Sequence, residues 1–224
     1  MSVRHQVSDE LLLDYASGSL SEGWRIAVAS HLALCPQSRR RLAVMELTAG
    51  ALIEEEQPES STADDDDAWS AMRTRLAAGG GALSGGVDTP RPVSRDAIVL
   101  PEPLRSYAGG DVGSLKWRPL GRGAYHILIP TADKSTSVRL LRIPAGKPVP
   151  EHGHGGRELT LVLSGSFNDG GEVFARGDLE EADETLEHQP VATPGEDCIC
   201  LAVTDAPLKF RSWLVRLVQP VLGI

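Results

Sequence analysis

The sequence has few of the features that mark secreted or membrane proteins. It contains no run of about 18 consecutive apolar residues, and its first ten residues, MSVRHQVSDE, lack the apolar core of a secretory signal. Cysteine is scarce, with three in 224 residues, so no disulfide framework is expected. These absences predict a cytoplasmic protein that is held together by packing and has no membrane partner.

Positive charge is also in short supply. The chain has 22 lysines and arginines against 31 aspartates and glutamates, a net charge of −9. Phosphate contacts need a basic face, so direct binding to nucleic acid is not expected. Residues 1–78 hold 7 basic against 13 acidic residues and therefore carry −6 of this charge. We expect this acidic first third to face a basic partner.

Helical periodicity dominates the first third of the chain. The apolar pattern predicts helices that begin near Ser8, Ser21 and Pro36, and a fourth within DDDDAWSAMRTRLAAGG. The four acids of that segment favour the positive end of a helix dipole. We therefore expect a helical module of about four helices over residues 1–78.

The composition changes twice after this module. Residues 79–97, GGGALSGGVDTPRPVSRDA, contain five glycines and two prolines without any sustained period, as is typical of a flexible linker. From residue 98 onward, short β-rich runs such as AYHILIP, SVRLLRIP and ELTLVLSG alternate with glycine and proline, which indicates a sandwich or barrel. The predicted fold class is α+β and multi-domain, with a helical bundle, a linker and an all-β domain over residues 98–224.

A His-x-His pair followed by a glutamate, EHGHGGRE, is the strongest candidate site. His152, His154 and Glu158 share even parity, so they project from one face if the segment is extended. Two imidazoles and a carboxylate suit zinc, iron, manganese, copper or nickel. His188 lies in a later predicted strand and His126 in an earlier one. The ion could keep an open position for catalysis or could be a closed tetrahedral zinc.

The spacing around this pair resembles that of cupins. The stretch GKPVPEHGHGGRELTLVLSG fits the first cupin motif, G-x5-H-x-H-x3-E-x6-G, at every named position, from Gly146 to Gly165. Gly177 and His188 keep the glycine-to-histidine spacing of the second motif, whose other landmarks are replaced. The resemblance implies a jelly-roll barrel with one metal ion, expected to be zinc, on His152, His154, Glu158 and His188.

The helical third contains a second motif, HLALCPQS. His31 and Cys35 share a helix face, but Ser38 stands where an H-x3-C-x2-C zinc pattern needs its last cysteine. An acidic helical module with this segment, followed by a single cupin domain, resembles the ChrR anti-sigma factors. The resemblance implies a regulator without enzymatic activity. It would bind an RpoE-type extracytoplasmic-function sigma factor 1:1 and release it under singlet oxygen or organic hydroperoxides.

The chain departs from the family at the zinc site of the helical module. Gln6 occupies the place of a histidine and Ser38 that of a cysteine, so two of the four implied ligands are altered. We therefore expect zinc there to be absent or weakly bound, although His5, His31 and Cys35 could form a poorer three-ligand site.

Two other interpretations stay open at this point. The protein could be a metal-dependent cupin dioxygenase or isomerase with a helical oligomerisation module. It could also be an interaction module whose cupin metal is purely structural and whose regulatory partner is different. Cys198 and Cys200, two residues apart, are expected to be small buried residues, with a redox or signalling role as the alternative.

Overall fold

The computed structural model describes residues 3–56, 63–78, 98–121 and 123–211. Four helices occupy the first third, as the periodicity predicts: α1 (Asp9–Ser17), α2 (Glu22–Leu34), α3 (Pro36–Glu55) and α4 (Ala63–Ala78). The Ser8 hydroxyl caps α1 by accepting a hydrogen bond from the backbone N–H of Leu11, and Gly18 ends the helix with φ +74°. The predicted linker 79–97 lies outside the described residues.

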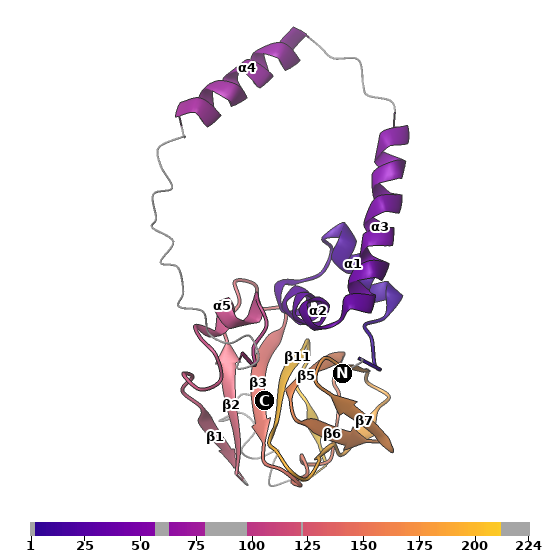
Figure 1. The fold of residues 1–224 in the computed structure, drawn as a ribbon, viewed down its shortest axis with the longest axis vertical. Helices are drawn as coiled ribbons and strands as arrows, with labels where there is room; N and C mark the ends of the chain where they lie inside the picture. The colour runs from indigo at the N-terminus through magenta and orange to yellow at the C-terminus, as the bar shows by residue number, and fades with distance from the viewer. Residues whose placement is uncertain (1–2, 57–62, 79–97, 122, 212–224) are drawn as a thin grey trace. The chain divides into compact units, whose positions relative to one another are not determined.

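The β-rich region contains three antiparallel sheets, which fit the jelly-roll arrangement of a cupin (Figure 1). The large sheet has the order β1-β2-β3-β11-β5-β8, with β1 (Arg118–Gly121), β2 (Ala124–Ile129), β3 (Ser137–Ile143), β11 (Cys198–Thr204), β5 (Glu158–Ser164) and β8 (Leu179–Ala182). The second sheet joins β10 (Val191–Ala192), β6 (Ser166–Asp169) and β7 (Glu172–Ala175). The third joins β12 (Lys209–Phe210), β4 (His152–Gly153) and β9 (Glu187–His188).

The sequence pattern gave no bounds for the shortest elements. Strands β4, β9, β10 and β12 have two residues each, which is too short for an alternation to be visible. A five-residue helix, α5 (Leu104–Ala108), precedes β1 and was also not predicted. The sequence also predicts a strand in the β-rich run FRSWLVRLV near the C-terminus, and most of this run lies outside the described residues.

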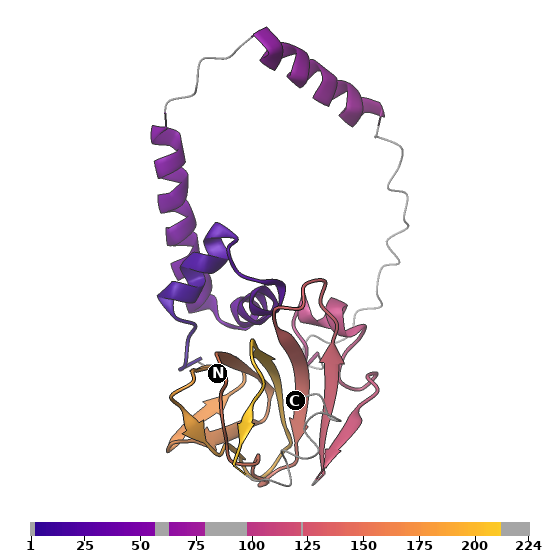
Figure 2. The ribbon, with the colours of Figure 1, turned by 180° about the vertical axis from the view of Figure 1, so that it is seen from behind.

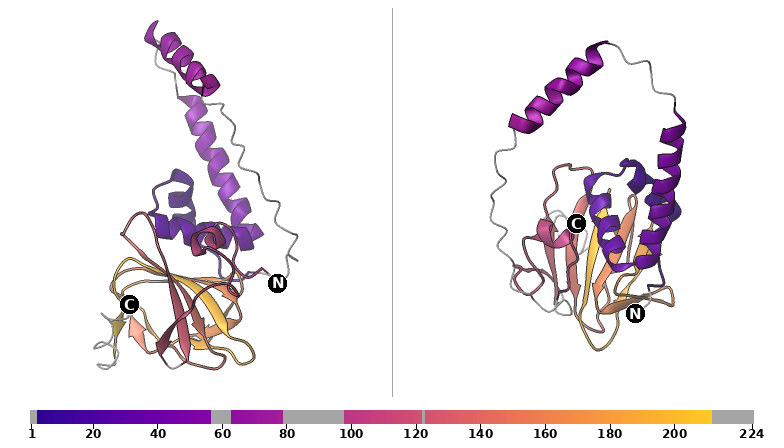
Figure 3. Two further views of the ribbon diagram at one scale, coloured as in Figure 1. Left: turned by 90° about the vertical axis from the view of Figure 1, so that its left-hand side faces the viewer. Right: turned by 45° about the horizontal axis from the view of Figure 1, so that its top comes forward.

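The large sheet separates two environments because its side chains alternate. On β5, Leu159, Leu161 and Leu163 enter a core that also contains apolar residues of α1 and α2. Helix α2 therefore packs on β5 and β11, as Figures 2 and 3 also show. Gly23 lets α2 also lie close to the start of β3, because a Cβ there would lie 2.1 Å from the Thr136 hydroxyl oxygen.

This shared core joins the first helices and the β-rich region in one compact unit. Contacts group Met1–Met45 with Ile98–Ile224 in one compact unit and set Glu46–Ala97 apart as a second. Helix α2 thus buries its apolar face on the sheet and α1 packs on α2, so these two helices and the β-rich region share one core. The predicted boundaries at residues 78 and 98 stay a hypothesis about which segments have separate roles.

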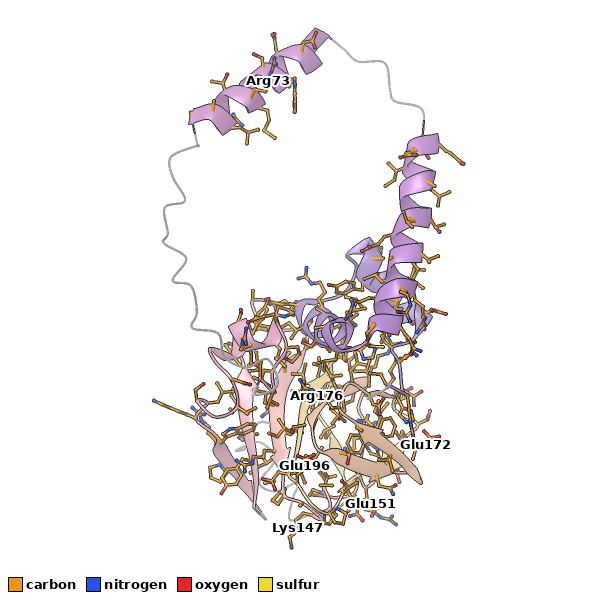
Figure 4. All side chains as sticks on the ribbon, in the orientation of Figure 1. Arg73, Lys147, Glu151, Glu172, Arg176 and Glu196 are labelled. Atoms are coloured by element: carbon orange, nitrogen blue, oxygen red, sulfur yellow. The ribbon has the colours of Figure 1, made fainter. Side chains whose placement is uncertain are left out.

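The second unit leaves its apolar side chains exposed. Helix α3 runs from the first unit into the second. Leu42, in the first unit, is buried, but Leu52 and Ile53, in the second, are 62% and 73% exposed. In α4, Trp69, Met72 and Leu76 are all at least half exposed, and the side chains around Arg73 project from the helix in Figure 4. Within the described residues, no helix is long and apolar enough to cross a bilayer.

Candidate metal centre

Two short strands bring the predicted ligands together. His152 on β4 pairs directly with His188 on β9, and His154 follows β4 by one residue. All three histidines are buried, and His126 is not among them, because its ring contacts Arg139 on β3. The strand pairing thus explains how residues 36 positions apart come to form one cluster.

The ring nitrogens of this cluster converge on one point. The Nε2 atom of His188 lies 3.2 Å from Nε2 of His154 and 3.2 Å from Nε2 of His152. The ligand atoms of the three residues all lie within 4.8 Å of one another. Two nitrogens that bind one ion at about 2.1 Å are roughly 3.0 to 3.4 Å apart, so the observed spacing fits a shared ion.

In two of these rings, a hydrogen bond at Nδ1 determines which nitrogen carries the proton. His152 Nδ1 lies 2.8 Å from the Pro150 carbonyl oxygen, and His188 Nδ1 lies 2.8 Å from the Asp169 carboxylate. Both oxygens only accept, so each Nδ1 donates, and the proton-free Nε2 of a singly protonated ring would direct its lone pair at the other ring. Two lone pairs at 3.2 Å repel unless a cation lies between them.

Glu158 lies beside the cluster, next to His154. Its Oε2 is 3.5 Å from His154 Nδ1, and both atoms are buried without a hydrogen-bond partner. Its other oxygen accepts a hydrogen bond from Thr160 at 2.9 Å. Burial would raise the pKa of Glu158, but the neighbouring His154 and His152 rings and the hydrogen bond from Thr160 outweigh it and leave the pKa lowered. The unpartnered pair is a further sign that this centre is built for a cation.

Two carboxylates behind His188 were not predicted from the sequence. Asp169 on β6 bonds His188 Nδ1, and Glu180 on β8 lies 3.9 Å from the same atom. Burial, with Asp169 and Glu158 nearby, raises the pKa of Glu180 to about 8. Asp169 lies 19 residues from His188 and belongs to no motif, so only strand pairing could place it here.

His152, His188 and Glu158 line a cavity of about 780 Å³ inside the β-rich region. Its walls also include Leu141, Ile143, Phe167, Cys198 and Cys200. Both cysteines are buried, as predicted, and the hydrogen bond with Cys198 and burial raise the pKa of Cys200. Glu151, labelled in Figure 4, precedes His152 but forms a salt bridge of 2.7 Å with Arg211 on the surface.

The helical candidates lie elsewhere in the same compact unit. His31, Cys35 and Ser38 are fully buried and in mutual contact. His5 is not part of this group: its ring stacks on Phe174 at 4.1 Å and lies 3.5 Å from the Glu172 carboxylate, which Figure 4 labels. The proposed three-ligand site of His5, His31 and Cys35 is therefore not assembled.

Comparison with known proteins identifies the family of the β-rich region and a relative of the whole chain. Residues 106–207 match the ChrR cupin-like domain family. The anti-sigma-E factor ChrR of Cereibacter sphaeroides is 44% identical over 224 residues, which cover the whole of both chains. The chain belongs to the ChrR family.

A solved ChrR structure has the same fold as this ChrR-family protein. The crystal structure of Rhodobacter sphaeroides SigE in complex with the anti-sigma ChrR matches with a TM-score of 0.73 and 41% identity. The match covers 91% of this chain and 100% of that chain. Both ChrR relatives are anti-sigma factors, which favours the regulatory interpretation of the sequence over the dioxygenase.

Proposed function

We propose that this protein is a cytoplasmic anti-sigma factor. It sequesters an RpoE-type extracytoplasmic-function sigma factor 1:1 and releases it under singlet oxygen or organic hydroperoxides. The exposed apolar side chains of α3 and α4 carry the proposal, because several large apolar side chains exposed on neighbouring turns of a helix are typical of a docking site. They are Leu47, Leu52, Ile53, Trp69, Met72 and Leu76.

The nature of the partner follows from family and charge. A relative that aligns over nearly the whole chain was solved with a sigma factor bound. The acidic first third suits a basic, DNA-binding surface, and such complementarity speeds association and sets orientation. Aromatic residues such as Trp69 are frequent anchors at interfaces. Sequestration then follows from covering surfaces that the sigma factor needs for promoter DNA and RNA polymerase.

The cupin domain is proposed to hold one metal ion that the stress response needs. His152, His154 and His188 would bind it through Nε2, with Glu158 as the fourth predicted ligand and zinc as the expected ion. A bound ion would neutralise the converging lone pairs and join β4, β5 and β9. The protein's own contribution is to fix the ring orientations through the Pro150 carbonyl and Asp169.

Co-expression with the sigma factor encoded nearby tests the main claim. We expect the two chains to co-purify as a 1:1 complex by size-exclusion chromatography with light scattering. If no complex forms and the isolated protein turns over small diketones or thiols, the cupin dioxygenase interpretation replaces the anti-sigma one.

A surface variant tests which helices bind. Trp69→Ala combined with Leu76→Ala should weaken sigma binding at least 30-fold, because interface anchors are worth about 2 kcal/mol or more. Its melting temperature should stay within about 2 °C of wild type, since both side chains are exposed. Leu128→Ala, an exposed leucine of β2, is the matched control and should leave affinity unchanged. An equal loss of sigma-factor affinity in both variants would contradict the assignment of the docking surface to these helices.

A further inference from the structure

The buried group at the junction of α2 and α3 does not fit the zinc ion that the family resemblance implies. A serine hydroxyl is a poor zinc ligand at neutral pH, and Ser38 takes the position of a thiolate. The Gln6 side chain donates to Gln37 Oε1 at 2.6 Å and accepts from Arg41, so it is engaged away from His31. Only two of the four expected ligand types, His31 and Cys35, are therefore available.

Hydrogen bonds satisfy this group without an ion. His31 Nδ1 lies 2.9 Å from the Gly177 carbonyl oxygen and must donate to it, which leaves a lone pair on Nε2. The Ser38 hydroxyl lies 2.9 Å from that Nε2 and donates a hydrogen bond to it, and the Val7 backbone N–H lies 3.4 Å from the same atom. The same hydroxyl is 3.3 Å from Cys35 Sγ, whose own S–H can complete the chain, while the Ser38 N–H contacts the sulfur at 3.4 Å.

The bonding partners show what this chain of contacts joins. Cys35 is the C-cap of α2, Ser38 lies in the first turn of α3, and Gly177 belongs to the turn between β7 and β8. Gly177 has φ +93°, and a Cβ there would lie 2.7 Å from Val3 Cγ2, so the position suits glycine. Three separate elements therefore meet at one buried histidine.

Burial makes the satisfied arrangement important. His31, Cys35 and Ser38 are each 0% exposed, and none of their polar atoms is without a partner. In such a setting, removing one hydrogen-bonding group leaves another buried and unpaired, which destabilises the fold. Burial also lowers the pKa of His31 to about 4, so the ring is neutral and its Nε2 is an acceptor at physiological pH.

We propose that His31, Ser38 and Cys35 form a metal-free hydrogen-bonded chain that replaces a zinc ion in joining α2, α3 and the β7–β8 turn. Ser38 is the residue that determines whether hydrogen bonds or a metal ion join these elements. Its hydroxyl donates a hydrogen bond to the His31 lone pair that an ion would otherwise bind, and a serine at this position takes the place of a thiolate ligand.

Cobalt spectroscopy on the full-length protein tests the proposal. Co²⁺ bound by a thiolate shows charge-transfer absorption in the near ultraviolet, whereas Co²⁺ on histidines and carboxylates does not. We expect no Cys35-dependent band in wild type. Ser38→Cys should produce such a band, and the double variant Gln6→His, Ser38→Cys should bind Co²⁺ more tightly than the single one. Adding Cys35→Ala to either variant must remove the band, which separates it from Cys198 and Cys200.

Two results would overturn the proposal. A thiolate band in wild type that disappears in Cys35→Ala would mean that the native group binds metal. The absence of any Cys35-dependent band in both Ser38→Cys variants would mean that Ser38 is not the deciding residue.

A stability measurement tests the hydrogen bonds separately. Ser38→Ala should lower the melting temperature by several degrees in chelator, and Co²⁺ should not reduce that difference, because no ion takes part. Ser17→Ala is the control, since Ser17 is an exposed serine at the end of α1. A Ser38→Ala protein that melts like wild type would show that the chain does not hold these elements together.

Discussion

The two buried histidine groups of this protein differ in whether a hydrogen-bond donor reaches the Nε2 lone pair. In the cupin group, Nδ1 donates outward from His152 and His188, so their Nε2 lone pairs face each other at 3.2 Å. In the helical group, His31 also donates through Nδ1, but its Nε2 meets the Ser38 hydroxyl at 2.9 Å. A buried histidine therefore indicates a metal only where no donor reaches the remaining lone pair.

The largest expected effect comes from removing the cupin ligands. His152→Ala with His154→Ala should reduce bound metal from about one equivalent per chain to almost none, because two of the three converging nitrogens are lost. The variant should also lose release of the sigma factor under singlet oxygen or hydroperoxide while it keeps sigma binding. Plasma emission spectrometry and a release assay provide the two measurements.

The control for this pair is His126→Gln, which removes a buried histidine outside the cluster and should keep the metal. Loss of sigma binding in the double variant would contradict the proposed separation of metal sensing from partner binding.

Protonation of His31 should have the next largest effect. Its pKa is about 4 in the folded protein against an ordinary 6.5, so only the unfolded chain takes up this proton between those values. The contribution of His31 to stability is complete above pH 6.5 and decreases by roughly 3 kcal/mol as the pH falls to 4. NMR titration of the His31 ring measures this directly. A ring that titrates near pH 6.5 would refute the buried, neutral state on which the helical hydrogen-bonded chain depends.

A smaller effect is expected at the carboxylate behind His188. Asp169→Asn keeps the shape of the side chain but removes the charge that supports His188 Nδ1, so metal affinity should fall about 10- to 100-fold. Competition with a chromogenic chelator measures the change. Asp183→Asn, an exposed carboxylate after β8, should have no effect. If both variants bind metal like wild type, Asp169 does not orient the ligand.

The sequence allowed prediction of the longer elements and most of the cluster, for a physical reason. Helices of nine or more residues and strands such as β3, β5 and β11 leave a periodic pattern that one segment displays by itself. His152, His154 and His188 follow from motif spacing, because the motif records which positions a cupin directs inward. Asp169 and Glu180 could not be found in this way, since each lies on a four-residue strand whose neighbours are set by sheet pairing.

The division into units was also beyond the sequence. The sequence predicts a bundle of helices, but α2 packs on β5 and β11, and its apolar residues share a core with Leu161 and Leu201. Periodicity identifies a face that must be buried and does not identify what buries it. The same limit applies to Trp69 and Leu76 of α4, whose exposure could only be found in the structure.

The sequence by itself determined the element types, the acidic balance, the cupin motif and the absence of two zinc ligands, because these are properties of local composition and spacing. The tertiary structure alone decided which histidine lone pairs remain without a donor. That outcome depends on contacts such as Gly177 with His31 and Asp169 with His188, which join residues 146 and 19 positions apart. Hydrogen-bond saturation is a property of the folded neighbourhood, so the same residue type can bind metal in one place and exclude it in the other.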